Sequence, residues 1–152
     1  MVDNMGLVNI DSSDYVSPTD INNNFKKLDV LGLDYVTESG KSGEWWYRKW
    51  KSGRAECGID YKVFGNKSLT DLYTSFLFRT ADMTFGAYPF SFSSRPFVSV
   101  SFAGDTNSTR GAFPVLRHTT STTTSPTFFI VAFNDSSDMN VSASIFVSGS
   151  FK

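Results

Sequence analysis

The chain has 152 residues, the size of one ordinary domain with enough interior for a hydrophobic core. Aromatic residues make up 16% of it and charged residues only 19%, a composition that favours β-strands and argues against a helical bundle. The net charge of -1 gives no support for a nucleic-acid partner or for binding to an anionic membrane surface.

Residues 1–16 predict an extended arm. They have no hydrophobic period and contain the polar run DSSD at 11–14, so we expect another protein to order them. They lack the basic and apolar regions of a signal peptide, and no apolar run in the chain is long enough to span a membrane. We therefore expect synthesis in a cytoplasm and no membrane insertion.

A short helix is predicted over about residues 18–31. The run SPTD at 17–20 supplies a serine cap, a proline for the first helical position and a capping-box carboxylate, and Gly32 supplies the stop. Between them Ile21, Phe25 and Leu28 follow the four-then-three spacing of a coiled-coil seam. We predict that these three residues form oligomer contacts; a helix packed on its own sheet is the alternative.

The glycine-rich run GKSG at 40–43 predicts a linker. It divides the chain into an attachment arm with its helix (1–42) and a second unit (43–152).

Residues 45–58 predict a β-hairpin around Ser52-Gly53, and they include all three tryptophans and the only cysteine. A two-residue loop places positions 50, 48 and 46 opposite 55, 57 and 59. The structural face of the hairpin then holds Trp46, Arg48, Trp50 and Cys57, together with Ala55 and Ile59.

The other face of this register pairs Lys49 with Glu56 and lays Tyr47 over Gly58. A bulge after Gly53 would shift every pair by one residue.

Beyond the hairpin, Ala55, Cys57, Ile59, Tyr61 and Val63 alternate with polar or small residues, which predicts a half-buried antiparallel strand. Further strands are predicted at about 72–79, 83–92, 96–103, 112–118, 127–133 and 139–151, separated by turn-forming runs. Short strands with regular turns predict an all-β fold, an antiparallel β-sandwich or jelly roll.

Two motifs carry a family resemblance. The pattern W-x-Y-R-K-W-x-S-G-x-A-E-C at 45–57 resembles the hairpin of small fibre and knob proteins of tailed bacteriophages, and residues 88–98 resemble their YP-x-x-F-x-x-x-P-x-V strand pair. The resemblance covers roughly residues 43–152. Cys57-Gly58 departs from the Cys-Trp-Gly that often follows in that family. The resemblance implies a virion structural module, commonly a homotrimer, made in the host bacterial cytoplasm.

No catalytic, cofactor or metal site is predicted. His118 is the only histidine, so one chain cannot chelate a metal through two of them, and a nucleophilic pair of Cys57 with His118 would depend on the fold bringing them together. A strand-face thiol and a strand-end imidazole are the simpler interpretations. The sequence also singles out no pair of carboxylates for glycoside cleavage.

Trp46 and Trp50, with Arg48 between them, allow two interpretations. Exposed indole faces would form a sugar-binding platform, whereas buried ones would be core or subunit contacts with the guanidinium held over an indole. The apolar face of the predicted register favours the second interpretation. A carbohydrate-binding module that uses the hairpin tryptophans is therefore the alternative function.

We expect a non-enzymatic, trimeric fibre or knob of a bacteriophage virion, either a tail fibre for receptor binding and host attachment or a head fibre that decorates the capsid. Its expected partners are its own copies, another virion protein through residues 1–16, and a bacterial surface glycan.

Overall fold

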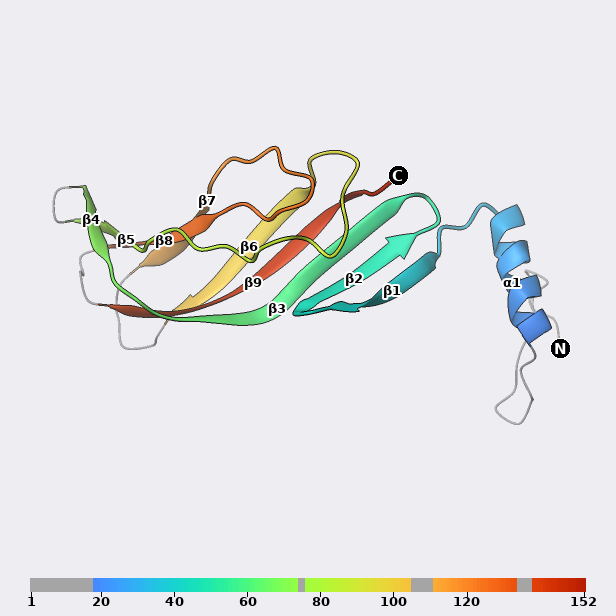
Figure 1. Ribbon diagram of the computed structural model, residues 1–152, viewed down its shortest axis with the longest axis horizontal. Coiled ribbons are helices and arrows are strands. Elements are labelled where there is room, and N and C mark those ends of the chain that lie inside the picture. Colours follow the sequence, from blue (N-terminus) through green and yellow to red (C-terminus); the bar gives the residue numbers. More distant parts are fainter. Residues whose placement is uncertain (1–17, 74–75, 105–110, 134–137) are drawn as a thin grey trace.

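The computed structural model describes residues 18–73, 76–104, 111–133 and 138–152, and it contains two antiparallel β-sheets preceded by a short helix (Figure 1). The predicted all-β sandwich with an N-terminal helix is confirmed. The predicted arm, residues 1–16, lies outside the described residues.

Helix α1 spans Pro18–Val30, and the two sheets follow it in the chain. The first sheet has the strand order β1 (Val36–Ser42), β2 (Trp45–Trp50), β3 (Arg54–Lys67), β9 (Met139–Ser150) and β6 (Phe97–Gly104). The second has the order β4 (Thr70–Tyr73), β5 (Leu77–Arg79), β8 (Phe128–Phe133) and β7 (Ala112–Leu116). The long strands β3 and β9 pair at the centre of the first sheet.

The core lies between the sheets, and strand β9 shows how the sequence builds it. From Met139 to Val147 every second residue of β9 is buried, whereas the residues on the other face include Ser142, Ser144 and Ser148. Strand β3 and strand β8 add further side chains to the same core. The main contributors are Met139, Val141, Ala143, Ile145, Val147, Ala55, Cys57, Ile59, Phe128, Ile130 and Ala132.

Strand β3 changes face halfway along its length. The sequence pattern predicts that Tyr61 and Val63 continue the buried face, but both are 67% exposed. This prediction is wrong because the pairing of β3 with β9 shifts just before Lys62, and such a bulge turns the following side chains to the other side. Phe64 points to the core instead, with its ring centroid 5.3 Å from that of Phe85.

Two predicted strands are also different in the structure. The segment predicted as one strand at 72–79 belongs to the antiparallel β4–β5 pair. The segment 83–92 forms only isolated bridges at Met83 and Ala87, because Gly86 has a φ of 89° and Pro89 cannot donate to a ladder. Its large side chains nevertheless enter the core: Met83, Phe85, Tyr88 and Phe92.

Helix α1 stands beyond the β1 side of the sandwich (Figure 1). Its end is the predicted one, since Gly32 has a φ of 66° and the Leu31 amide donates to the Lys27 carbonyl at 3.0 Å. In the described part of the chain no strand packs against α1, so the alternative of a helix packed on its own sheet is wrong. Its length and polarity also rule it out as a membrane-crossing helix.

Strand β1 corrects the predicted linker. Residues 40–43 lie in β1 and in the turn to β2, and β1 pairs with β2 from Val36 to Ser42. The segment 36–42 is therefore the edge of the first sheet. The division into arm and knob stays a prediction, and because β1 belongs to the sheet, its boundary would have to lie between α1 and β1.

Candidate functional site

The β2–β3 hairpin has the shifted register. Trp46 pairs with Gly58, Arg48 with Glu56 and Lys49 with Ala55, which leaves residues 51–53 as the loop. Gly53 has a φ of 90°, and a three-residue loop that ends on a glycine in this conformation adds the extra residue. The two-residue loop and the pairs built on it are wrong.

The loop is held by a carboxylate that the sequence did not point to. Asp34 accepts hydrogen bonds from the Ser52 amide at 3.0 Å and from the Ser52 hydroxyl at 2.8 Å. Both oxygens of one side chain thus bind the loop, which favours the three-residue turn.

The shifted register moves the predicted β2 residues to the opposite face, whereas Ala55, Cys57 and Ile59 of β3 stay on the predicted core face. The core side of the hairpin consists of Trp45, Tyr47, Ala55, Cys57 and Ile59, and Trp45 is only 6% exposed. Trp46 and Trp50 lie on the outer side, partly exposed, as does the exposed Arg48. Lys49, which was predicted to face Glu56, instead pairs with Glu38 of β1 at 2.9 Å.

A shallow groove of about 230 Å³ lies beside Trp46 on the outer face. The indole Nε1 donates to Asp60 Oδ1 at 2.8 Å, and the ring lies 6.2 Å from that of Phe146. Trp46, and not Tyr47 as predicted, lies over Gly58, because a Cβ at Gly58 would lie 2.7 Å from Trp46 Cζ2. Ser99, Ser101 and Ser144 complete the groove.

Charged groups cover the rest of the outer face of the hairpin. Glu56 lies between Arg48 at 3.7 Å and Arg54 at 4.0 Å. The Arg48 guanidinium is 6.0 Å from the centre of the Trp46 ring, and Arg54 is 5.3 Å from that of Trp50. The predicted guanidinium–indole contact therefore exists, on an exposed face instead of in the core.

Cys57 is a buried free thiol of the inner face. Burial, with a smaller contribution from the neighbouring Glu56, raises the pKa of Cys57 to about 12. A thiol with this pKa is protonated at neutral pH and is not a nucleophile. His118 is exposed elsewhere, in a pocket that Cys57 does not line.

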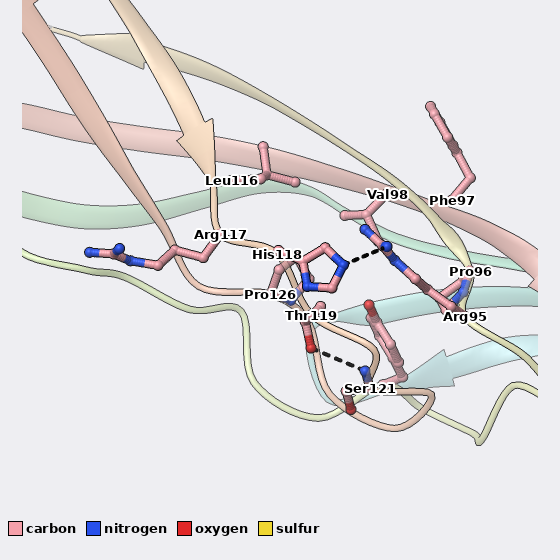
Figure 2. A pocket seen from close by; sticks show the side chains of 11 residues that line it. Arg95, Pro96, Phe97, Val98, Leu116, Arg117, His118, Thr119, Ser121 and Pro126 are labelled. Carbon is pink, nitrogen blue, oxygen red and sulfur yellow. Dashed lines mark hydrogen bonds between the residues drawn. The ribbon is translucent and has the colours of Figure 1, made fainter.

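That pocket, of about 700 Å³, lies between β6 and β7, the edge strands of the two sheets (Figure 2). Its apolar walls come from Pro96 just before β6, Val98 near the start of β6, Leu116 at the end of β7, and Pro126. The loop segments 88–96 and 117–126 bring polar side chains to it.

The pocket holds an arginine paired with a histidine. Arg95 Nη1 lies 3.1 Å from His118 Nε2, and because arginine has no acceptor, the histidine nitrogen accepts the hydrogen bond. The Ser121 amide donates to Thr119 Oγ1 at 3.1 Å on the adjoining loop.

Tyr88 lines the same pocket and is only 7% exposed, and its hydroxyl has no hydrogen-bond partner among the described residues. Its pKa is raised to about 12 by burial and, to a smaller extent, by Cys57. Buried hydroxyls without a partner are uncommon in native structures.

Arg117 has a structural role, and Figure 2 shows it directed away from Arg95 and His118. Asp82 accepts two hydrogen bonds from Arg117, at 2.9 and 3.2 Å, and the hydrogen bond from Arg117 lowers the pKa of Asp82. Asp82 also accepts from Arg79 at 3.1 Å, and both guanidinium groups cover the ring of Phe129.

The two hollows differ in the charged side chains that line them. Among the described residues, no carboxylate lines the pocket, and Asp60 is the single carboxylate that lines the Trp46 groove. No group of three metal-ligating side chains occurs in the part of the chain that the structure describes. Together they offer hydroxyls, aromatic rings, the imidazole of His118 and two arginines, of which Arg117 is already bonded to Asp82.

The predicted oligomer contacts lie on the exposed helix. Ile21 and Phe25 are 43% and 44% exposed, and the Phe25 ring contacts Tyr35 at 5.4 Å. Leu28 belongs to α1, and its side chain lies outside the described part.

The pairing of Arg95 with His118 was missed. The sequence offers no sign of it beyond a lone histidine and an arginine at the ends of two predicted strands.

Comparisons with known proteins find one matching solved structure. No family model matches the chain, and no curated protein matches it. A solved structure of the R1 pyocin fibre of P. aeruginosa, comprising C-terminal residues 323-701, is similar with a TM-score of 0.48 and 13% sequence identity. The match covers 89% of this chain and 32% of that one, so this chain spans about a third of the fibre fragment.

Proposed function

We propose that this chain is a structural protein of a bacteriophage virion, a fibre or knob in which the β-sandwich is displayed on the particle and binds the host surface. The observation that carries the proposal is the position of α1, which stands clear of the sandwich and exposes Ile21 and Phe25. A helix of 13 residues is marginal alone in water, so this one needs a partner. The resemblance of the hairpin at 45–57 to phage knob proteins is the reason for assigning the chain to a bacteriophage virion.

The partner of the helix is a second and third copy of the chain. A homotrimer would bury the seam of Ile21, Phe25 and Leu28 at its axis, as in a short coiled coil. The Phe25→Asp variant should dissociate to a monomer in light scattering, whereas Asn23→Asp, which adds the same charge at another exposed position of α1, should keep the trimer. A wild-type monomer would refute the trimer, and a trimeric Phe25→Asp variant would refute the seam.

Attachment to the particle is assigned to residues 1–16. A chain without them should fold with an almost unchanged melting temperature and should be absent from purified particles, because the arm precedes the sandwich in the chain and binds another virion protein. Cryo-electron microscopy of the intact particle distinguishes a tail position, for host attachment, from a capsid position. A particle without this protein would contradict the proposal altogether.

Carbohydrate binding through the hairpin is the second candidate function. It is favoured by the partly exposed position of Trp46, whose indole is fixed by Asp60 beside three serines. Indole faces and hydroxyl groups are what a pyranose contacts. In a glycan-binding assay, Trp46→Phe should weaken binding without unfolding the protein.

The role is binding, and we propose no enzymatic activity and no cofactor. This is supported by the single carboxylate in the Trp46 groove and by the raised pKa of Cys57. Hydrolysis of a glycan by the purified chain would contradict it.

A further inference from the structure

We propose that the pocket between β6 and β7 binds the anionic group, a carboxylate or a phosphate, of an acidic saccharide, with Arg95 as the principal contact. The proposal rests on the proposed function only for the source of the ligand, a polymer of the bacterial surface. The binding itself is a property of the isolated protein.

The first observation is that Arg95 differs from the other described arginines in its partner. Five arginines lie in the described part of the chain, and four of them have a carboxylate partner: Arg48 and Arg54 with Glu56, Arg79 and Arg117 with Asp82. Among the described residues Arg95 has none, and its contact is the imidazole of His118 at 3.1 Å. Its positive charge is therefore available to a ligand.

The second observation is how Arg95 is held. His118 accepts one of the five guanidinium N–H groups, which orients the side chain along the pocket, and the other donors have no partner in the part of the chain that the structure describes. The following residue, Pro96, is buried and fixes the backbone at this point. A guanidinium oriented in this way can bind a carboxylate or phosphate through two parallel hydrogen bonds.

The third observation is independent of charge. Tyr88 is more than nine-tenths buried and lines the same pocket, and no described residue bonds to its hydroxyl. A sugar oxygen or an oxyanion in the pocket would supply the missing acceptor. Because burial raises the pKa of Tyr88 to about 12, this hydroxyl keeps its proton and remains a donor at neutral pH.

The remaining walls fit a sugar ring. Val98, Leu116 and Pro126 offer apolar surface, and Ser121 offers a hydroxyl at the edge. The volume of about 700 Å³ is within the usual range for ligand sites and has room for one or two pyranose units. An aliphatic acid would leave the hydroxyl groups unused, whereas a neutral sugar would leave the Arg95 charge unused.

The test is isothermal titration calorimetry on the purified full chain. Trigalacturonate carries the carboxylate, glucose 6-phosphate carries the phosphate, and maltotriose and glucose are their neutral counterparts. We expect at least one acidic probe to bind tenfold or more tightly than its neutral counterpart, with an affinity that falls as salt rises. The acidic probe that binds identifies the group. Equal binding of acidic and neutral probes, or binding of none, overturns the proposal.

Variants locate the site. Arg95→Gln should weaken binding of the acidic probe tenfold or more, and Tyr88→Phe should weaken it severalfold with an unchanged or higher melting temperature. Arg54→Gln removes the same charge from the outer hairpin face and should bind like the wild type. An Arg95→Gln protein that is folded and binds like the wild type would sink the proposal. These measurements need no particle, so they can succeed or fail independently of the virion assignment.

Discussion

The two faces of the β2–β3 hairpin use similar residues for opposite purposes. Trp45 and Trp46 are neighbours in sequence, yet Trp45 is 6% exposed with its ring against Tyr88, whereas Trp46 lies on the outer face with its Nε1 bonded to Asp60. Alternation along a strand makes this unavoidable, because adjacent side chains point to opposite sides of the sheet. The role of a residue in this hairpin therefore depends less on its type than on which face of the sheet its position along the strand selects.

Each face has its own kind of partner. The inner face packs against buried side chains of the second sheet and of the segment 83–92. The volume and packing of its residues therefore determine how much they contribute to stability. The outer face carries ion pairs around Glu56 and guanidinium groups over indoles, which solvent screens. Substitutions on the two faces should consequently differ in size and in kind.

The largest expected effect is at Trp45. Replacing Trp45 with Ala removes a ring that packs edge-on against Tyr88 at 5.6 Å, and it should lower the free energy of unfolding by about 3–5 kcal/mol. Urea denaturation followed by circular dichroism measures this loss. A loss below about 1 kcal/mol would contradict the burial of Trp45 on the inner face.

Gly58 joins the two faces and should give the next largest effect. A Cβ at this position would lie 2.6 Å from the Ile145 carbonyl oxygen and 2.7 Å from Trp46 Cζ2, so the backbone of β9 or the indole must move. Gly58→Ala should cost about 1–3 kcal/mol and change the tryptophan fluorescence. Gly40→Ala is the matched control, because its Cβ meets only the Tyr47 side chain, at 3.1 Å. Equal stability of both variants would contradict the register.

Much of the fold follows from local patterns in the sequence. The alternation in β9, the helix signals around 17–32 and the glycine in the hairpin turn each act within a few residues, and each predicted its element. The faces of the hairpin could not be predicted in this way. Their assignment depends on whether the loop has two or three residues, because β2 carries aromatic residues on both faces and either face could join the apolar side of β3.

The pocket depends on still longer connections. Arg95 and His118 are 23 residues apart and meet because the edge strands β6 and β7 belong to different sheets that pack together. The irregular path of 83–92, which positions Tyr88, follows from packing in the core as much as from Gly86 and Pro89. No periodicity in the sequence reports such contacts.

A smaller effect is expected at alkaline pH from Cys57 on the inner face. Its pKa is about 12 in the folded protein against an ordinary value of 9.0, so the unfolded chain loses its proton first as pH rises. The contribution of Cys57 to the free energy of unfolding is therefore fully present below about pH 9. It falls from there toward pH 12, by at most about 1.4 kcal/mol over the first pH unit. Denaturation at pH 8 and 10 measures the slope. The Cys57→Ala variant should show a shallower one; an identical slope would assign the effect to other groups.

The smallest expected effect is at Trp50, and it tests the outer face directly. The ring is partly exposed and lies under the Arg54 guanidinium at 5.3 Å, so truncation loses only part of the burial that an interior tryptophan has. A partly buried aromatic ring and one exposed cation–π contact together amount to about 1 kcal/mol. Trp50→Ala should therefore stay folded and remain at least about 2 kcal/mol more stable than Trp45→Ala in the same urea series. If the two variants lose equal stability, Trp50 packs against another protein surface or another copy of the chain, and repeating the series at tenfold lower protein concentration would reveal that contact as a concentration-dependent midpoint.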